Sequence, residues 1–396
     1  MLDSISIGTS GLQTFSAGLK VISNNVANLN TPGFKASTTT FSNLYVADAD
    51  PGGGGLDGQT PQGGGVTLSQ TSVNFRVGEL RQTGNPLDLN IDGEGFFITR
   101  KPGDEDPVYT RAGQFEFDRN GVLVVRGTDR QVIGLDASGA QTAITLEGLR
   151  INAPKPTSKV DLTGNLSSSA TDFSLSGVKV IDAAGGEHTL SLRFAPKAGA
   201  AGTWTVTASD GASEVGSGEV QFASGHPVPG FDAFTISYAP SGVPVSDIKV
   251  DLSGDVTNFD TGSNSTLAVG TSDGVAVGTL SKVAFEADGS MTVSYSNGQT
   301  AKGTRVALAL FDSNARLVPQ DDSGFTYPAH EGLRAGAANQ GGFGSIGSNQ
   351  IEGSNVDLAS EFSDLIVAQR GYQASSRIVS TANDMLQDLL DMKGQR

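Results

Sequence analysis

Apolar residues recur every seven positions near the N-terminus. Two series run three residues apart, the first Ile5, Leu12, Leu19 and Val26, the second Gly8, Phe15, Ile22 and Leu29. This a/d spacing predicts an amphipathic helix that packs against other helices. We expect the helix to end within residues 28–33, because Pro32 disfavours helical backbone at Thr31 and Gly33 permits a left-handed turn.

The C-terminal end repeats the seven-residue period. One position of the repeat holds Leu358, Leu365, Tyr372, Val379 and Leu386. The other position is mixed polar and holds Phe362, Gln369, Ser376, Asn383 and Leu390. We expect a second helix with Asn355 or Asp357 as its N-cap. Periodicity alone leaves two possibilities open, namely ordinary surface helices on one core or a coiled-coil-like domain of residues 1–35 and 354–396.

The chain between these ends differs in character. Residues 36–72 are polar and contain two glycine runs, which predicts a flexible connector. From residue 73 onward, apolar and polar residues alternate in short segments separated by turn signals such as Asn120-Gly121, Asp288-Gly289 and Asn297-Gly298. This alternation predicts β-strands and hairpins.

Two composition changes suggest domain boundaries in the β region. Pro154 and Pro156 mark one, and a Gly/Ser/Thr/Asp-rich stretch at 262–278 marks the other. We expect a first β domain of residues 73–150 and 276–353, with a second β domain of 151–275 inserted in it. The predicted fold class is therefore α+β and multidomain, with terminal helices and two all-β domains.

Composition narrows the function. The formal net charge is −16, which disfavours nucleic acid as a partner, because phosphate binding needs clustered basic residues. Cysteine is absent, so disulfides and thiolate chemistry are excluded. No run of apolar residues is long enough to span a membrane. We expect no cleavable signal peptide, because the first residues have neither a positive region nor an apolar core.

Several motifs resemble catalytic or binding signatures without their context. Residues 342–347 match G-x-G-x-x-G and residues 270–274 match G-x-S-x-G, but neither lies in an alternating β/α pattern. The acidic segments at 118–121 and 182–187 are interpreted as hairpin turns, and His188 as a residue on a strand surface. The sequence therefore predicts no catalytic residue, no cofactor and no metal site.

Longer motifs at both ends are similar to those of a known family. The N-terminal segments Ser23-Asn24-Asn25-Val26-Ala27-Asn28 and Thr31-Pro32-Gly33-Phe34 resemble the signature of the bacterial flagellar rod and hook family. Ser354-Asn355-Val356-Asp357 and Gln369-Arg370 resemble its C-terminal signature. Inner segments at 87–97 and 109–113 also match, in the same order.

The resemblance implies a structural subunit rather than an enzyme. Rod members of the family are shorter, so the inserted domain implies a hook subunit that assembles into a flexible tube and passes motor torque to the filament. It further implies export through the flagellar type III apparatus, an extracellular location in the hook and basal body, and other flagellar axial proteins as partners. A distal rod protein remains an alternative. Outside the family, a secreted β-rich adhesin or binding module also remains open.

The resemblance assigns polymerisation to the terminal helices, which would form an inner tube. The N-terminal helix contains glycine, which weakens isolated helices, so we expect both ends to be disordered in the monomer and helical in the polymer. The expected polymerisation residues are Ile5, Leu12, Phe15, Leu19, Ile22, Val26, Leu29, Leu358, Phe362, Leu365, Tyr372, Val379 and Leu386.

Overall fold

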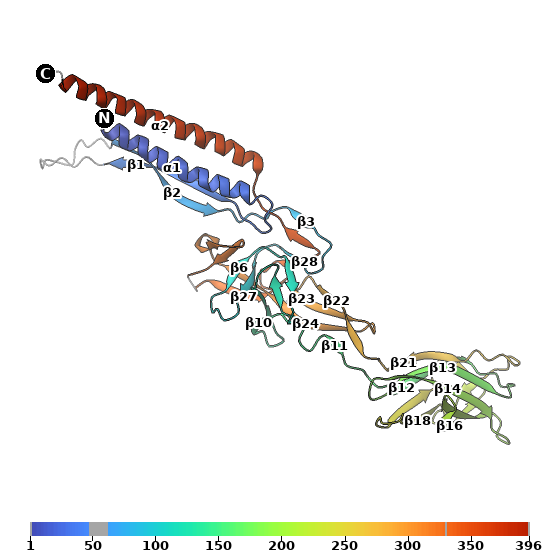
Figure 1. Cartoon of the computed structure of the whole chain (residues 1–396). Helices are drawn as coiled ribbons and strands as arrows, with labels where there is room; N and C mark the ends of the chain where they lie inside the picture. The colour runs from blue at the N-terminus through green and yellow to red at the C-terminus, as the bar shows by residue number, and fades with distance from the viewer. Residues whose placement is uncertain (1, 47–61, 329–330, 395–396) are drawn as a thin grey trace. The chain divides into compact units, whose positions relative to one another are not determined.

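A computed structural model describes residues 2–46, 62–328 and 331–394 (Figure 1). The chain divides into two compact units. The first consists of Met1–Leu146, Val283–Thr292 and Lys302–Arg396, and the second of Glu147–Lys282 and Val293–Ala301. The expected α+β architecture is confirmed, with a helix at each end and β structure between them. No described helix combines the length and apolar character of a membrane span.

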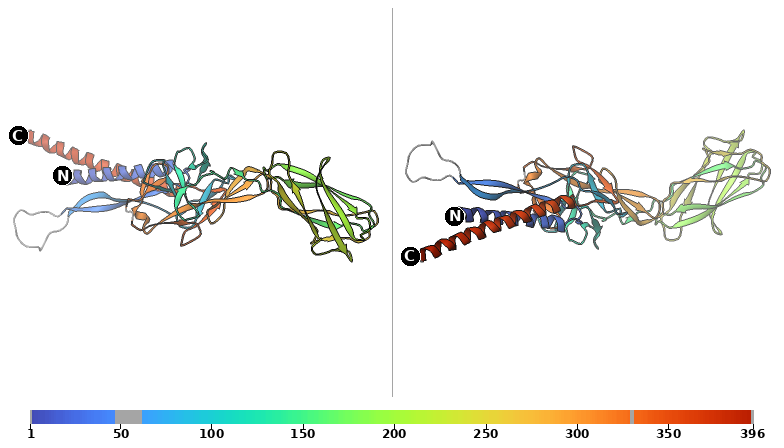
Figure 2. Two further views of the ribbon diagram at one scale, coloured as in Figure 1. Left: turned by 90° about the horizontal axis from the view of Figure 1, so that it is seen from below. Right: turned by 90° about the horizontal axis from the view of Figure 1, so that it is seen from above.

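Two terminal helices pack side by side and run in opposite directions (Figures 1 and 2). They are α1 (Leu2–Ala27) and α2 (Leu358–Gly394). The carboxylate of Asp357 accepts hydrogen bonds from the backbone N–H groups of Ala359 and Ser360, at 2.9 and 3.3 Å. Asp357 is therefore the N-cap of α2. Leu29, the last residue of the second N-terminal series, lies in the turn that follows α1, within the expected helix end at residues 28–33.

The predicted connector contains a β-hairpin. Strands β1 (Ser37–Val46) and β2 (Gln62–Val73) pair antiparallel and lie along α1 (Figure 2). The prediction of a flexible connector is wrong for these strands, while Pro51–Gly55 lies outside the described residues. Gly65 explains the error. Its φ of +110° brings the hairpin so close to α1 that a Cβ there would collide with Ser10 Oγ. Glycine here permits close contact rather than flexibility.

The rest of the first unit is built from short strands around an aromatic core. Phe96, Tyr109 and Phe325 are buried in this core, and Phe75 packs against Phe96 and Phe325. The strands are β3 (Leu80–Gln82), β4 (Leu89–Asp92), β5 (Phe96–Arg100), β6 (Val108–Thr110), β7 (Phe115–Phe117), β8 (Leu123–Val125), β9 (Gln131–Leu135), β10 (Gln141–Ala143), β25 (Val318–Gln320), β26 (Gly324–Thr326), β27 (Leu333–Ala337), β28 (Ser345–Ser348) and β29 (Gln350–Glu352), with a 3-10 turn at Asn314–Arg316.

The second unit is a β-sandwich of two five-stranded sheets. One sheet has the order β18-β19-β12-β20 with β21 paired to β12, and the other has the order β13-β14-β15-β16-β17. Both sheets contribute to one core, in which Trp204 is 2% exposed. The strands of the sandwich are β12 (Lys159–Asn165), β13 (Phe173–Ile181), β14 (Glu187–Pro196), β15 (Thr203–Asp210), β16 (Ser213–Ala223), β17 (His226–Pro227), β18 (Ala233–Tyr238), β19 (Ser246–Asp251), β20 (Val256–Thr257) and β21 (Ala268–Ser272). Strand β11 (Ile151–Asn152) pairs with β22 (Gly278–Phe285) instead, outside the sandwich.

The boundary expected at 262–278 falls inside the sandwich. Strand β21 lies in that stretch and pairs with β12, although its small polar residues suggested a linker. The chain instead passes between the units within β22 (Gly278–Phe285), β23 (Ser290–Tyr295) and β24 (Thr300–Phe311). The division therefore lies several residues outside the expected limits of 151 and 275.

Candidate assembly site

The contact between α1 and α2 is made by small side chains. In α2 the buried residues are Glu361, Ala368, Ser375 and Ala382, spaced seven apart. On α1 they face Gly8 and Gly11, where an added Cβ would collide with Val379 and Ser375 respectively. Glycine in α1 costs helix propensity but lets the second helix approach closely. We call these residues of the two helices the helix seam.

The predicted polymerisation residues of α1 lie on or beside the seam. Ile22 is buried, and Ile5, Leu12, Phe15, Leu19 and Val26 are half-buried. Phe15 covers Gly371 of α2 and packs edge-on against Phe41 of the hairpin, with ring centroids 5.9 Å apart. The N-terminal heptads therefore identify the packed face of α1.

The predicted C-terminal residues divide into two groups. Leu365, Val379 and Leu386 are half-buried, whereas Leu358, Phe362 and Tyr372 are exposed. The second heptad series, from Phe362 to Leu390, is wholly exposed and lies one residue beyond the true seam. The prediction that it packs as a seam is wrong for the single chain, because Ala368, Ser375 and Ala382, one residue earlier in each repeat, occupy the buried position.

Large apolar side chains of α2 consequently face outward. Phe362 is 51% exposed and Leu390 is 67% exposed. Of these exposed residues, Tyr372, Ile378 and Met385 stand three or four residues from a seam residue and therefore lie on the seam side of α2. The set that lies away from the seam comprises Phe362, Ile366, Val367 and Leu390. We call this set the outer face of α2. An apolar face of this extent marks an interaction surface.

Asn25, from the N-terminal signature, connects both helices to the hairpin. Its side-chain carbonyl accepts a hydrogen bond from the N–H of Ser37 at 3.0 Å, and its amide donates to the carbonyl of Ser37 at 2.8 Å. The amide also donates to Glu361 Oε1 at 2.9 Å. Asn25 is 1% exposed, so these bonds fix α1, β1 and α2 together. The neighbouring residues Ser23, Asn24 and Ala27 are exposed.

Glu361 makes this contact sensitive to pH. Burial raises the pKa of its carboxyl above the usual 4.5, against the hydrogen bond from Asn25, while Asp364 and Asp357 raise it further. A raised pKa means that the folded form binds the proton more tightly than the unfolded form. The stability it contributes is present below pH 4.5 and is lost as the pH rises through the raised value.

Acidification is therefore expected to stabilise the helix pair. The thermal loss of helical circular dichroism should move to higher temperature as the pH falls from 7 towards 4.5. Glu361→Gln removes this titration and should flatten the pH dependence relative to the unchanged chain. Equal slopes for both proteins would contradict a role for Glu361.

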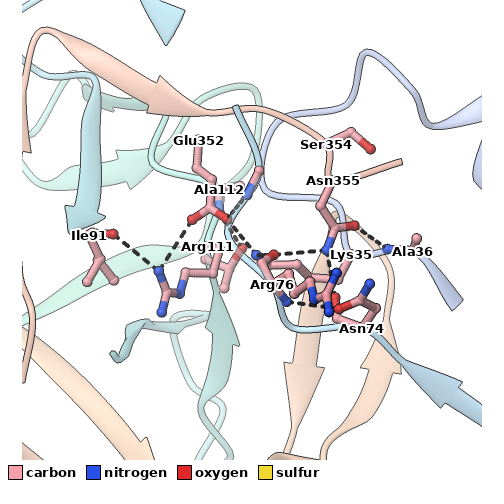
Figure 3. Close-up of polar contacts among 12 residues, drawn as sticks. Lys35, Ala36, Asn74, Arg76, Ile91, Arg111, Ala112, Glu352, Ser354 and Asn355 are labelled. Carbon is pink, nitrogen blue, oxygen red and sulfur yellow. Dashed lines mark hydrogen bonds and ion pairs between the residues drawn. The ribbon is translucent and has the colours of Figure 1, made fainter. Parts of the chain in front are cut away.

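A buried ion network joins the base of the helix pair to the first β domain (Figure 3). Lys35 Nζ lies 2.5 Å from Glu352 Oε1, and Arg111 Nη1 lies 3.3 Å from Glu352 Oε2. The three side chains are at most 5% exposed. Burial lowers the pKa of both Lys35 and Arg111, and the charge of Glu352 opposes the shift in each case.

Backbone groups complete this network. Arg111 donates to the carbonyls of Ile91 and Gly93, at 3.2 and 2.8 Å, and Lys35 Nζ donates to the carbonyl of Arg76 at 2.6 Å. Lys35 and Arg111, which stand 317 and 241 residues before Glu352 in the sequence, thus meet at its one buried carboxylate. The network was not predicted. The sequence feature that could have indicated the network is a single charged residue within an otherwise uncharged run, as in Gly33-Phe34-Lys35-Ala36.

Two further signature residues hold the same junction. The side chain of Asn355 accepts from the N–H of Ala36 at 2.7 Å and donates to the carbonyls of Asn74 and Arg76, at 2.7 and 2.9 Å (Figure 3). Gly33 has a φ of +67°, and an added Cβ would collide with the backbone of Ala112.

The other signature residues have simpler roles. The hydroxyl of Thr31 donates to the side chain of Asn28, closing the turn after α1. Val356 is buried beside the start of α2, Pro32, Phe34 and Ser354 are half-buried, and Gln369 and Arg370 are exposed.

The motifs that resembled catalytic signatures are structural. Ser272 ends strand β21, and Asp273 caps the neighbouring strand by accepting hydrogen bonds from the N–H groups of Ser158 and Lys159, at 2.8 and 2.9 Å. Residues 342–347 form a turn that leads into β28, which pairs with β4.

The acidic segments form turns, as predicted. Asp182 accepts hydrogen bonds from the N–H groups of Ala184 and Gly186, both at 2.8 Å. His188 lies in β14 with Nε2 2.8 Å from Asp182 Oδ2, and its ring packs edge-on against Tyr238. His188 therefore makes specific contacts with Asp182 and Tyr238, whereas we had expected it to lie on the strand surface without them.

Comparison with known proteins agrees with this geometry. Three family models match the chain: flagella basal body rod protein at residues 5–35, flagellar hook protein FlgE/F/G D1 domain at 90–165, and flagellar basal body rod FlgEFG protein C-terminal at 348–392. The flagellar hook protein FlgE of Rhizobium meliloti is 30% identical, with 98% of each chain covered. The chain belongs to the flagellar hook protein family.

Other hook proteins are similar over the same length. FlgE of Escherichia coli is 29% identical over 97% of this chain and 98% of its own, and FlgE of Treponema pallidum is 28% identical over 99% and 100%. The crystal structure of Helicobacter pylori FlgE2 aligns at 12% identity with a TM-score of 0.43, over 67% of this chain and 98% of that chain. A score this low does not establish a shared arrangement. The family is a family of structural proteins, and this chain is a flagellar hook subunit.

Proposed function

We propose that this hook subunit polymerises through its terminal helices into a flexible tube, which acts as a universal joint between the flagellar motor and the filament. The observation that carries the proposal is the outer face of α2. Its large apolar residues are exposed in the single chain, although the helix already has α1 as a partner. In a member of the hook family, the natural partner for this face is another copy.

The two units have different tasks in this proposal. The helix seam and the network around Glu352 supply a rigid connection that transmits torque from the helices to the first β domain. The second unit contacts neighbouring copies, and these contacts break and re-form as the tube bends. Its charged side chains support this role, because exposed pairs such as Lys179–Glu187 and Lys197–Glu219 are weak and easily exchanged.

Helix order is coupled to assembly in the same proposal. The apolar residues beside the helix seam are mostly half-buried rather than buried, so the contact between α1 and α2 leaves part of their apolar surface in water. When another copy covers the outer face of α2, the exposed apolar side chains there are buried as well, and this burial stabilises the helices. The subunit is exported through the flagellar type III apparatus, and it meets other axial proteins at the two ends of the hook.

The alternatives have less support. A distal rod protein would share the terminal helices but form a stiff tube. An adhesin would need an aromatic binding surface, whereas Trp204 belongs to the core of the sandwich.

Electron microscopy of the concentrated protein in negative stain tests the proposal. Curved tubes support a hook subunit, and straight tubes would favour the rod alternative. A chain that stays monomeric under all assembly conditions would overturn the proposal.

Removing the second unit should abolish bending but not polymerisation. Lys155 and Val275 exchange two backbone hydrogen bonds of 2.9 Å, so they already form an antiparallel pair that a two-residue turn can close. Replacing residues 156–274 with Asn-Gly is expected to give tubes that are straight in micrographs. If this variant folds but forms no tubes, the second unit is needed for assembly itself, which would contradict the proposed division of tasks.

A further inference from the structure

Four charged residues of α2 follow one another at seven-residue spacing. They are Arg370, Arg377, Asp384 and Asp391, and all four are exposed. Each of the first three stands two residues after a seam residue, about 200° around the helix and on the side away from α1. None has an opposite charge three or four residues away along α2, where helical ion pairs form. The stripe is thus basic in one half and acidic in the other.

We propose that the α2 helices of neighbouring copies pack in parallel with an axial offset of fourteen residues, or about 21 Å. In this register Arg370 and Arg377 of one copy face Asp384 and Asp391 of the next. The inference rests on the proposed function, and it specifies which copy-to-copy contact covers the outer face of α2.

Side-chain size supports the same offset. The large residues Phe362, Ile366 and Val367 are clustered on the outer face, and each is at least 51% exposed. Fourteen residues further along α2 stand Ser376, Ser380 and Thr381, which are also exposed. The register therefore sets large apolar side chains of one copy against small side chains of the next, as ridges pack into grooves.

Other partners fit the stripe less well. The charged residues of α1 are Asp3 and Lys20 alone, so α1 of another copy cannot match the two basic and two acidic residues of the stripe. An antiparallel contact of two α2 helices would also match the signs, with Arg370 facing Asp391. That contact is isologous and closes on two copies, whereas an offset parallel contact leaves each end open for a further copy.

Charge reversal tests the register. Arg370→Asp with Arg377→Asp places four acids on the stripe, so the critical concentration for polymerisation should rise about tenfold or more. Adding Asp384→Arg and Asp391→Arg to that chain restores the complementary pattern and should restore assembly. Circular dichroism verifies that each variant keeps its helices, because all four positions are exposed.

Disulfide cross-linking identifies directly which residues of neighbouring copies lie close together. Because the chain contains no cysteine, every cross-link must come from the introduced cysteines. In assembled protein, Arg370→Cys with Asp384→Cys should oxidise to a ladder of covalent multimers. Arg370→Cys with Asp391→Cys should not cross-link, and dimers from this pair would establish the antiparallel contact and overturn the proposal. Unchanged polymerisation after charge reversal would overturn the register alone. A parent chain that forms no polymer would overturn the proposed function together with the register.

Discussion

The chain carrying Val379→Asp is expected to form no tubes. Val379 is half-buried in the helix seam, and its side chain lies against Gly8 of α1. Aspartate there would lose water without gaining a partner, because Gly8 has no side chain and the other residues beside it, Ser375 and Ile378, carry no positive charge. The cost of burying such a charge is several kcal/mol. The helices would separate, and with them the surface that other copies bind.

The same substitution should leave the β domains intact. Val379 contacts α1 near its start, far along the helix pair from the network around Glu352. Trp204, the single tryptophan, reports unfolding of the second unit, and amide exchange in β5 reports on the first. Both should match the unchanged chain. If amide exchange in β5 is strongly accelerated, α2 supports its own β domain and the surface-helix alternative is correct.

Asp388→Asn is the matched control. Asp388 is exposed on the same helix and lies outside both the seam and the proposed charged stripe. Its substitution should leave tube yield unchanged. Tubes from Val379→Asp in normal yield would contradict a role for the seam in assembly.

The sequence was sufficient for the helices and the β domains. Seven-residue spacing predicted α1 and α2, and Asp357 was one of two predicted caps. Signals of this kind depend only on the sequence of one segment and on which of its residues are buried. They can therefore be interpreted without knowing which other segment packs against it. Alternation in the middle of the chain predicted β structure for the same reason.

Predictions that depended on a partner segment were less successful. The second heptad series of α2 was placed one residue away from the buried positions, because large residues such as Phe362 suggested the packed face while the buried Ala368 and Ser375 are small. Gly65 was interpreted as a source of flexibility, although it allows β2 to contact α1. Lys35 and Glu352 come together only through the fold, so no spacing within one segment could reveal their ion pair.

Breaking the ion pair of Lys35 and Glu352 is expected to have the second large effect, a loss of stability in the first unit. Glu352→Gln is expected to lower the free energy of unfolding of the first unit by about 3–5 kcal/mol. The carboxylate is fully buried, with Lys35 Nζ at 2.5 Å and Arg111 Nη1 at 3.3 Å, and it also accepts the N–H of Gly78 at 3.0 Å. Glutamine keeps the shape but leaves two cations buried without their counter-charge. Lys35 can lose its proton, since burial already lowers its pKa, whereas Arg111 stays charged.

Urea titration followed by amide exchange in β5 measures this loss, and Trp204 fluorescence should show an unchanged transition for the second unit. Glu187→Gln, which removes an exposed ion pair with Lys179, is the matched control and should change little. Adding Lys35→Met to Glu352→Gln removes one of the stranded cations, while Arg111 keeps its bonds to the carbonyls of Ile91 and Gly93. The double variant should therefore be more stable than Glu352→Gln alone. A double variant that is weaker still would show that Lys35 is held by the carbonyl of Arg76 rather than by charge, and that packing, not the ion network, joins the helices to the β domain.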